Sequence, residues 1–332
     1  MAVKDELLRE LESRRDQALS GQDLARRLGV SRNAVWKAVT ALRREGYVIQ
    51  AAANKGYCLA ADSDLLSEAA IRHHLPEAYR HLHILVLKET DSTNNEAKRL
   101  LAAGKSETAL VVAETQTAGR GRQGRSFYSP EQSGLYLTLI LQPEAGLADA
   151  LSITTRAAVA TVKAIEALTD KKPLIKWVND LYLDGKKICG ILTEAIADFE
   201  SGAVANVVVG IGVNVGTELF PAELAHTAGS LCPGRPLRNA LAAQIAAQLL
   251  EAAQDLTDTG YLDFYRSRSL VIGREIIYYQ AGQAHGATAL GIDDKGGLIV
   301  GDGEGNTRIL SSGEISLRLA PQEKAGPDWT TT

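Results

Sequence analysis

The alternation of apolar and polar positions divides the chain into three regions with different expected secondary structure. Residues 1–62 show helical periodicity followed by a hairpin pattern, which predicts a winged helix-turn-helix. Residues 63–270 alternate apolar strand runs with helical stretches, which predicts a central sheet domain in a multidomain α/β (or α+β) protein. Residues 271–320 contain short strands between turns, which predicts a small SH3-like β-barrel. The remaining residues, 321–332, are expected to form a disordered tail.

The N-terminal region has the signals of two consecutive helices. Ser20 and Asp23 form a capping-box pattern before the first, and Ser31 is placed to cap the second, which runs over 32–45. The inward positions of the second helix are Val35, Val39 and Leu42. A second helix that starts Ser-Arg-Asn after a short Gly turn is the arrangement that enters the major groove of DNA. The residues expected to contact DNA are Ser31, Arg32, Asn33, Lys37 and, in the wing, Lys55. The alternative is a small helical module for protein interaction or dimerisation.

The central region has the signals of a mixed sheet with long loops. Strands are expected at 82–88, 109–114, 135–141, 175–183 and 186–192, with a strand pair within 204–215. Helices are expected at 68–74, 93–101, 149–168, 237–257 and 260–267, and the polar loop 89–94 is expected to cap the second of these. Residues 216–235 are rich in Gly, Pro and small side chains, which predicts a long mobile loop.

The most informative stretch follows the strand at 109–114. Three glycines and three arginines alternate within Gly119–Arg125. Glycine lets the backbone turn tightly and approach a ligand closely, and arginine supplies a permanently charged fork that suits phosphate or carboxylate. This combination predicts a loop that folds over an anion. The alternative is a solvated basic loop without a ligand.

The same loop matches the dinucleotide-binding pattern G-x-G-x-x-G, which requires a helix to open at the third glycine. Here the loop continues into turn-forming residues and then into the apolar run 135–141, which has the pattern of a buried strand. The sequence therefore argues against a Rossmann site.

Charge is distributed unevenly along the 332 residues, a length that suggests two or three domains. Residues 1–60 contain 11 Lys and Arg against 7 Asp and Glu, whereas residues 61–332 contain 25 against 33. A basic N-terminal region on an acidic body indicates a polyanionic partner for the first domain only.

The cysteines and histidines do not indicate a metal site. Cys58, Cys189 and Cys232 are scattered, and free thiols in a reducing compartment are expected. The histidines between 73 and 83 lack carboxylate or cysteine partners at ligand spacing, so no protein-ligated metal is expected. The longest uncharged run, 201–217, is interrupted by glycines and predicts strands rather than a membrane span. With no apolar signal-peptide core at the N-terminus, a cytoplasmic protein with no membrane partner is expected.

Together these pieces resemble, from end to end, the bifunctional biotin–protein ligases that also act as biotin operon repressors. The motifs that carry the resemblance are Gly119–Arg125, Lys176–Asp180, Asp184–Leu192, Gly210–Asn214 and Gly313–Arg318. The Gly/Arg loop followed at this distance by the lysine hairpin is highly specific, whereas the helix-turn-helix is shared by many regulators.

The resemblance implies a central domain of the class II synthetase-like type and a two-step reaction. Biotin attacks the α-phosphate of ATP, accompanied by Mg²⁺, to give biotinyl-5′-AMP, and a lysine of the biotin carboxyl carrier protein then takes the biotinyl group. Biotinyl-AMP is also expected to favour a homodimer that binds operator DNA. Both chemical steps concentrate charge on phosphate oxygens, so fixed cations are required.

The resemblance also implies roles for individual residues. Catalytic roles fall to Lys187, Arg122 and Asp180. Biotin contacts are expected from Ser92, Thr93, Asn94, Gln116, Gly119, Arg120, Arg122, Lys187 and Gly190. Contacts to ATP or the adenylate are expected from Arg120, Arg122, Arg125, Phe127, Lys176, Asn179, Asn214 and Arg318. Lys186 is interpreted as a solvated hairpin charge, and Asn214 and Asp180 have turn or cap roles as alternatives.

Three positions depart from the family pattern: Val178 stands where proline is common, Phe127 where tryptophan is common, and Asn54 where glycine opens the wing turn. A ligase whose first domain no longer represses is one alternative, against which the complete recognition helix argues. Two other functions remain open. One is lipoate–protein ligation by a related domain, against which the Gly/Arg loop argues. The other is a biotin-sensing regulator that no longer transfers biotin, against which the intact Lys187 and arginine set argues.

Overall fold

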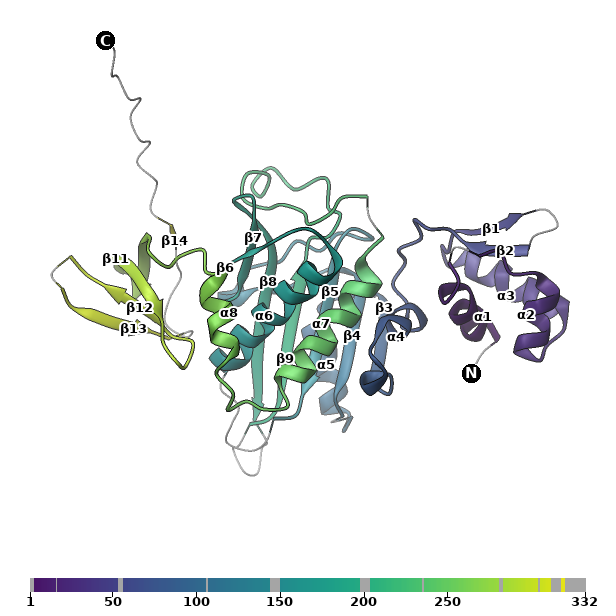
Figure 1. The fold of residues 1–332 in the computed structure, drawn as a ribbon, viewed down its shortest axis with the longest axis horizontal. Helices are drawn as coiled ribbons and strands as arrows, with labels where there is room; N and C mark the ends of the chain where they lie inside the picture. Colours follow the sequence, from purple (N-terminus) through teal and green to yellow (C-terminus); the bar gives the residue numbers. More distant parts are fainter. Residues whose placement is uncertain are drawn as a thin grey trace, which may run out of the picture.

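The computed structural model describes residues 3–15, 17–52, 56–105, 107–143, 150–197, 204–234, 236–280, 283–303, 305–311 and 318–319. Three units lie in a row (Figure 1): a small helical unit at one end, a large sheet unit in the middle and a second sheet unit at the other end. This agrees with the three regions predicted from the sequence. The predicted boundaries at 62 and 270 remain predictions, and the tail at 321–332 lies outside the described residues.

The N-terminal unit is a helix-turn-helix with a two-stranded wing. Its elements are α1 (Val3–Glu12), α2 (Gly21–Leu28), α3 (Arg32–Arg44), β1 (Ile49–Ala52) and β2 (Gly56–Leu59). Ser20 and Ser31 cap α2 and α3 as predicted, accepting hydrogen bonds from the backbone N–H groups of Asp23 and Ala34. The inward residues predicted for α3 are buried in the core of this unit.

The central unit contains a seven-stranded sheet in the order β3-β4-β5-β9-β8-β7-β6. Its strands are β3 (His83–Thr90), β4 (Ala109–Gln116), β5 (Leu135–Leu141), β6 (Leu174–Lys176), β7 (Asp180–Leu183), β8 (Lys186–Ala197) and β9 (Val204–Val213). Strands β3 and β4 pair in parallel and the other neighbours pair antiparallel. The mixed sheet expected from the sequence is confirmed.

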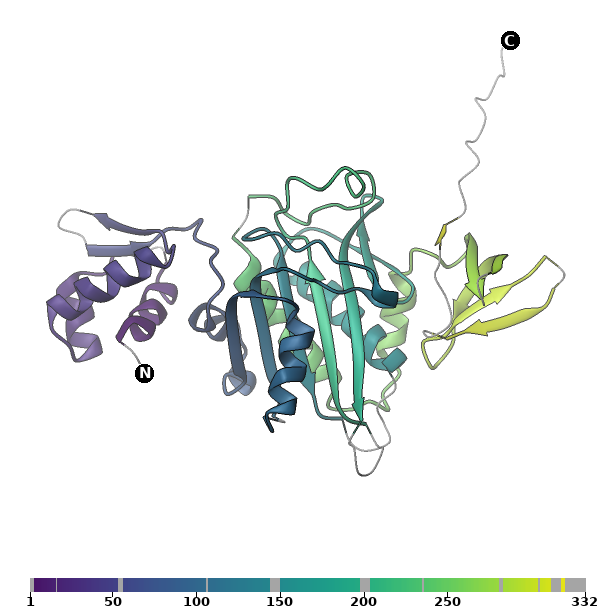
Figure 2. The ribbon, with the colours of Figure 1, turned by 180° about the vertical axis from the view of Figure 1, so that it is seen from behind.

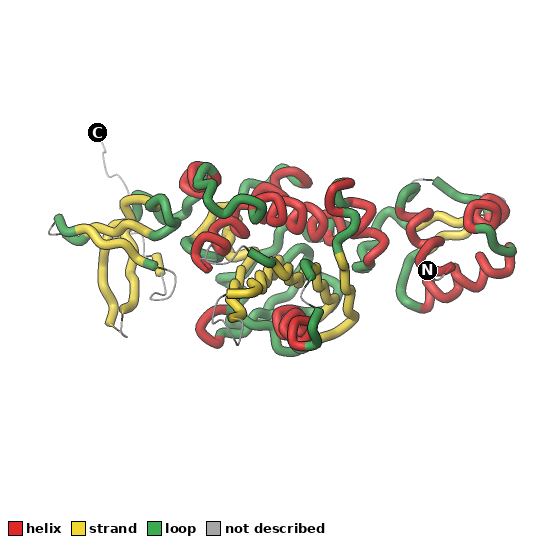
Figure 3. The backbone as a smooth tube through the Cα atoms, turned by 90° about the horizontal axis from the view of Figure 1, so that it is seen from below, coloured by secondary structure: helices red, strands yellow, loops and turns green. Residues whose placement is uncertain are grey.

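Helices cover both faces of this sheet. They are α4 (Glu68–His74), α5 (Thr93–Ala102), α6 (Ala150–Leu168), α7 (Arg238–Ala252) and α8 (Tyr261–Ser267), with short 3-10 turns at Glu77–Tyr79 and Arg122–Gly124. Helices α6 and α7 pack together on one face, and α5 covers the other (Figure 2). The layers are seen along the sheet in Figure 3. All of β5 is buried because it lies between these layers, which explains its unbroken apolar sequence.

Three strand and helix predictions are wrong in detail. The pair expected within 204–215 is the single strand β9, which pairs with β5 on one side and β8 on the other. Its glycines are extended and make room for neighbouring side chains instead of forming a turn. The run 175–183 is two strands, β6 and β7, that form a hairpin. The helix expected over 237–257 ends at Ala252.

The C-terminal unit is a five-stranded antiparallel sheet in the order β13-β12-β11-β10-β14. Its strands are β10 (Glu275–Gln280), β11 (Gln283–Ile292), β12 (Leu298–Gly301), β13 (Thr307–Leu310) and β14 (Arg318–Leu319). The turn between β11 and β12 contacts the central unit: the Trp177 indole N–H donates to the Gly296 carbonyl at 2.9 Å. Arg266 on α8 also pairs with Asp294 in this turn at 2.8 Å. Within the described residues, no helix is both long and apolar enough to cross a bilayer.

A buried ion cluster joins the segment after the wing to the central sheet. Arg238, at the first position of α7, has a side chain that is 3% exposed, and it pairs with Glu114 at 2.6 Å and Asp64 at 3.1 Å. The same guanidinium donates to the Gly134 carbonyl at 3.3 Å, and Glu114 accepts from the Leu66 N–H at 2.6 Å. Asp64 also accepts from the Arg238 N–H, which caps the start of α7. Glu114 and Gly134 lie at the two ends of the connection that contains the Gly/Arg loop. The Arg238 side chain contacts both residues and therefore holds both ends of this connection in place.

We expect replacement of Arg238 by Met to be strongly destabilising, because it leaves the buried Glu114 carboxylate without its cation. Breaking one partner of a buried pair costs roughly 3–5 kcal/mol. Urea unfolding followed by circular dichroism measures this loss. Arg26→Ala, which removes an exposed ion pair with Asp23, should cost at most about 1 kcal/mol.

The double variant Arg238→Met/Glu114→Gln should recover part of the lost free energy of unfolding, because the buried carboxylate is then neutral. A double variant that is less stable than Arg238→Met would contradict this account of the cluster.

Candidate active site

One cleft of about 380 Å³ gathers nearly all the residues that the sequence predicted for ligand binding. The predicted residues that line it are Ser92, Thr93, Asn94, Gln116, Arg120, Arg122, Arg125, Phe127, Lys176, Asn179, Asp180, Lys187, Gly190 and Asn214. Gly119 is next to the lining residue Arg120 but does not line the cleft itself. Arg318 is described only as part of the backbone of β14, and nothing in the described structure brings it to the cleft.

The start of α5 and the end of β4 form one wall of the cleft. The Gln116 side-chain oxygen accepts from the N–H and the hydroxyl of Thr93, at 2.8 and 3.1 Å. The Gln116 amide nitrogen donates to the Ser129 hydroxyl at 2.9 Å, which fixes the orientation of the amide. Ser92 occupies the N-cap position of α5, but its side chain makes no capping hydrogen bond. A side-chain cap from Ser92 is therefore excluded, whereas the position of this residue at the cleft agrees with the predicted ligand contact.

The Gly/Arg loop folds back on itself and no helix follows it. The Phe127 N–H donates to the Gly119 carbonyl at 2.9 Å, and the Gly121 N–H donates to the Arg125 carbonyl at 2.7 Å. A Cβ atom at Gly119 would lie 2.5 Å from the Phe127 carbonyl oxygen, so this tight fold requires glycine. The chain then passes through the irregular segment 126–134 and enters β5. This confirms the rejection of a Rossmann site, because no helix N-terminus follows the loop to receive a pyrophosphate.

The three arginines of the loop lie in different environments. Arg122 is half-buried and donates to the Asn179 side-chain oxygen at 3.2 Å. Burial lowers the pKa of Arg122, while the Asp180 carboxylate acts in the opposite direction. Arg120 and Arg125 are exposed at the rim, and Arg120 donates to the Asn95 side-chain oxygen at 3.3 Å. The loop thus directs one partly desolvated cation into the cleft and keeps two at its mouth.

Lys187 faces Asp180 across the β7–β8 hairpin, with 2.7 Å between its Nζ and the carboxylate Oδ1. Its backbone N–H donates to the Thr227 carbonyl at 2.8 Å, and its carbonyl accepts from the Gly229 N–H at 2.9 Å. The loop at 216–234 is therefore attached to the strand that carries Lys187. The neighbouring Lys186 is exposed and donates to the Ala225 carbonyl at 3.2 Å, which agrees with its interpretation as a hairpin charge.

An aromatic ring packs against glycines in the same cleft. A Cβ atom on Gly212 would lie 2.6 Å from the Phe127 ring, and a Cβ atom on Gly190 would lie 3.3 Å from it. Asn214 is buried and donates to the Gly229 carbonyl at 3.2 Å, while its own side-chain oxygen has no hydrogen-bond partner among the described residues. The Lys176 Nζ lies 5.6 Å from the centre of the Tyr182 ring. A flat ring, an open acceptor and a nearby cation suit a planar base with attached phosphates.

A second surface, separate from the cleft, contains the predicted DNA contacts. Ser31, Arg32, Asn33 and Lys37 are all exposed on the start and outer face of α3. Lys55 lies outside the described residues. The same face also exposes Trp36, which is 56% accessible. Trp36 was not among the predicted contacts, and its place between the inward positions Val35 and Val39 is the signal that could have identified it as an outward residue.

The comparisons with known proteins agree on one family. Family models match residues 4–58 (HTH domain), 86–214 (biotin/lipoate A/B protein ligase family) and 271–318 (biotin protein ligase C terminal domain). The chain is 37% identical to the bifunctional ligase/repressor BirA of Bacillus subtilis over 90% of this chain and 93% of that protein. It is 30% identical to BirA of Escherichia coli over 91% of this chain and 93% of the relative.

The chain belongs to the biotin protein ligase family. A solved biotin protein ligase of Aquifex aeolicus, in complex with biotin and ATP, superposes with a TM-score of 0.60 at 28% identity, covering 72% of this chain and 99% of that one. The structure has the helix-turn-helix and the central mixed sheet predicted from the sequence, and a five-stranded antiparallel sheet where a small SH3-like barrel was predicted. Each of the three regions is matched by a family model.

Several lining residues were not predicted from the sequence. They are Tyr136, Leu137, Tyr182, Ile191, Gly210, Gly212, Phe220, Leu224, Thr227 and Ala228, with others from the same strands and loops. Gly210 and Gly212 were noticed only as part of a family motif. Their role is steric: a Cβ atom at Gly210 would lie 2.1 Å from the Asn94 side-chain oxygen. Loop residues such as Phe220 reach the cleft through the tertiary fold and carry no local signal.

No metal centre is evident within the described ranges, where no group of three or more His, Cys, Asp or Glu side chains comes together. Cys58, Cys189 and Cys232 are free thiols. Burial raises the pKa of the Cys189 thiol well above its usual range, so this thiol stays protonated and unreactive at neutral pH.

We expect Gly210→Ala to displace Asn94 from the cleft wall, since the added methyl would overlap its side chain. Overpacking of this kind costs roughly 1–3 kcal/mol of stability. Gly216→Ala is a matched control, because its Cβ would meet nothing closer than 3.6 Å. Urea unfolding measures the free energy of unfolding of each variant. If Gly210→Ala and Gly216→Ala are equally stable, the space at Gly210 does not confine Asn94.

Proposed function

We propose that this chain is an ATP-dependent biotin–protein ligase that also represses transcription in response to biotinyl-5′-AMP. The observation that carries the proposal is the cleft in which Lys187, Arg122 and the Gly/Arg loop converge beside an aromatic ring. Membership of a family whose relatives are named bifunctional ligase/repressor supports both roles. A protein that consumes ATP and binds DNA is expected to work in the cytoplasm.

The first step joins the biotin carboxylate to the α-phosphorus of ATP and releases pyrophosphate. One carboxylate oxygen forms the new P–O bond while the bond to the β-phosphate oxygen breaks. Negative charge builds on the phosphate oxygens, and fixed cations in a partly desolvated cleft stabilise it. We assign this role to Lys187 and Arg122. The ion pair of Lys187 with Asp180 holds its ammonium in the cleft before substrate arrives.

Biotin fits the end of the cleft formed by α5 and β4. The side chains here offer neutral donors and acceptors for a ureido group: they are those of Ser92, Thr93, Asn94 and Gln116. Gly190, which has no side chain, leaves space beside Lys187. Gly119 shapes the loop, and we assign Arg120 and Arg122, which also line the cleft, to the biotin carboxylate.

ATP fits the opposite end of the cleft. We assign Phe127 to base or adenylate packing and Arg125, Lys176, Asn179 and Asn214 to polar contacts. We also propose that Arg318 lies near the nucleotide, as the family resemblance implies. Mg²⁺ would accompany ATP, bound mainly through phosphate oxygens and water as is usual for this ion, because Asp180 is the one carboxylate among the described lining residues.

In the second step, the amine of an acceptor lysine attacks the acyl carbon and AMP leaves. We propose that the acceptor is the biotin carboxyl carrier protein and that Asp180 helps to place its lysine at the cleft mouth. Closure of the loops at 119–127 and 216–235 over the adenylate would exclude water, which protects a mixed anhydride from hydrolysis.

For repression, we propose that biotinyl-AMP favours a homodimer whose two helix-turn-helix units, residues 1–62, bind two DNA half-sites. The ligase domain then spans 63–270 and the C-terminal domain 271–320. Such coupling requires only that the adenylate binds the dimerising state more tightly than the monomer.

We expect Lys187→Ala to lower the rate of biotinyl-AMP formation by roughly 10²–10³-fold, the range for loss of one preorganised donor to a developing charge. The assay follows retained label from α-labelled MgATP with biotin, then transfer to purified carrier domain. Lys186→Ala is the matched control and should remain near wild type, because Lys186 is exposed and the hydrogen bond that its ammonium makes is to the Ala225 backbone carbonyl.

The same assay with lipoate in place of biotin distinguishes the alternatives. Adduct from lipoate alone would identify a lipoate–protein ligase, and adduct without transfer would identify a biotin sensor. Wild-type rates in Lys187→Ala would overturn the catalytic assignment.

We expect Arg32→Ala to weaken binding to a specific operator by about 1–3 kcal/mol with relaxed sequence preference, as for loss of a base contact. Lys37→Ala should instead weaken binding to all sequences and reduce the salt slope by about 1, as for loss of one phosphate contact. Fluorescence anisotropy with adenylate-loaded protein over a salt series separates the two effects. Lys105→Ala, an exposed change in the central unit, is the control. Equal salt slopes in all four proteins would argue that α3 does not face DNA.

A further inference from the structure

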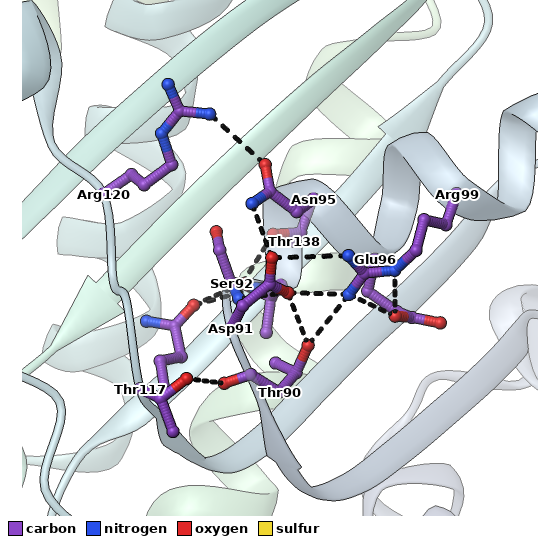
Figure 4. Close-up of polar contacts among 11 residues, drawn as sticks. Thr90, Asp91, Ser92, Asn95, Glu96, Arg99, Thr117, Arg120 and Thr138 are labelled. Atoms are coloured by element: carbon purple, nitrogen blue, oxygen red, sulfur yellow. Dashed lines mark hydrogen bonds and ion pairs between the residues drawn. The ribbon is translucent and has the colours of Figure 1, made fainter.

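A chain of polar contacts runs along α5 and ends on the Gly/Arg loop (Figure 4). Asp91, just before α5, accepts hydrogen bonds from the Ser92 N–H at 2.8 Å, from Arg99 at 2.7 Å and from the Asn95 amide nitrogen at 2.8 Å. The side-chain oxygen of Asn95 in turn accepts from Arg120 Nη1 at 3.3 Å. One helix and the turn before it are thus linked to a loop arginine that lies 25 positions beyond Asn95 in the chain.

The orientation of the Asn95 amide follows from this arrangement. A carboxylate only accepts hydrogen bonds, so the group that Asn95 presents to Asp91 must be its NH₂. The carbonyl oxygen of the amide is then directed at Arg120, which only donates. Hydrogen bonds from Arg99 and Asn95 keep the pKa of Asp91 well below its usual range. Asp91 therefore remains an acceptor throughout the neutral pH range, and the orientation of Asn95 does not change with pH there.

Besides its hydrogen bond to Asn95, Arg120 interacts electrostatically with the Glu194 carboxylate, which is itself paired with Lys98. Its side chain is exposed, its backbone lies in a loop, and Asn95 is the hydrogen-bond partner that the structure gives its guanidinium. Asn95 by contrast is half-buried on a regular helix. A long, flexible arginine loses rotamer freedom when a ligand immobilises it, and an existing contact reduces that cost.

We propose that Asn95, oriented by Asp91, is a positioning residue that holds Arg120 at the mouth of the cleft for the carboxylate of biotin and for its adenylate. Asn95 does not line the cleft and acts through Arg120. The inference rests on the proposed ligase function and adds to it a residue outside the predicted set. Helix α5 then has two roles, because its start contributes Ser92, Thr93 and Asn94 to the cleft while Asn95 beside them restrains the loop across it.

The test is a double-mutant cycle on four proteins: wild type, Asn95→Ala, Arg120→Ala and the double variant. The measured quantities are kcat, KM for biotin, KM for ATP and the half-life of retained biotinyl-AMP. We expect Asn95→Ala to raise KM for biotin and shorten the half-life by about three- to tenfold, the range for losing one neutral to charge-assisted hydrogen bond. KM for ATP should stay within about twofold of wild type.

The decisive comparison is between Arg120→Ala and the double variant. If Asn95 acts through Arg120, its removal has no further effect once Arg120 is gone, and the two proteins are indistinguishable. Multiplicative effects of the two substitutions would overturn the proposal, as would wild-type parameters in Asn95→Ala.

Glu96→Gln is the matched control. Glu96 is the next residue on α5 and accepts a hydrogen bond from Arg99 at 2.8 Å, and Figure 4 shows no polar contact that joins it to Asn95 or Arg120 among the residues drawn. It should behave as wild type, and a loss equal to that of Asn95→Ala would overturn the proposal by indicating a general effect on α5. If the proposed ligase function itself is wrong, the wild-type protein will form no adenylate from biotin. This outcome differs from failure of the Asn95 proposal, in which the wild-type protein is active.

Discussion

A buried guanidinium is the contact on which the arrangement of the molecule depends. Arg238 binds Glu114 at the end of β4, the Gly134 carbonyl at the start of β5 and Asp64 in the segment that leaves the wing. Charges removed from water are costly unless they are paired and fully hydrogen-bonded, so these groups are confined to one geometry. That geometry fixes the base of the ligand loop and the exit of the helix-turn-helix together.

Glycines on the strands shape the cleft as much as its side chains do, because they leave space for other groups. Gly210 and Gly212 lie on β9, where side chains would otherwise fill the space now taken by Asn94 and the Phe127 ring. The strand that pairs directly with β9, β8, carries Lys187 and is hydrogen-bonded to the loop at 216–234. A small ligand placed here would meet rigid strands on its floor and loops at its mouth, which suits a site that must admit substrates and then exclude water.

The cations of the cleft have different partners: Lys187 pairs with a carboxylate, whereas Arg120 and Arg122 donate hydrogen bonds to neutral amides. Asp180 holds Lys187, and the Asn179 side-chain oxygen accepts a hydrogen bond from Arg122. At the rim, Arg120 contacts the neutral amide of Asn95, while the nearby Asp91 is engaged by Arg99. A neutral partner positions an arginine without cancelling the charge that an anionic ligand needs.

The sequence by itself determined the elements whose signals are local. The caps at Ser20 and Ser31, the buried run of β5, α4 and the tight glycine-dependent fold of the Gly/Arg loop all depend on residues within a few positions of one another, and the structure agrees with each. The tertiary structure alone decided the strand order, the single strand β9, the approach of Phe220 to the cleft and the cluster in which residues 64, 114 and 238 meet. The physical reason is that hydrophobic periodicity reports which face of an element is buried but not what covers it. Contacts between positions more than a hundred residues apart form only when the whole chain packs.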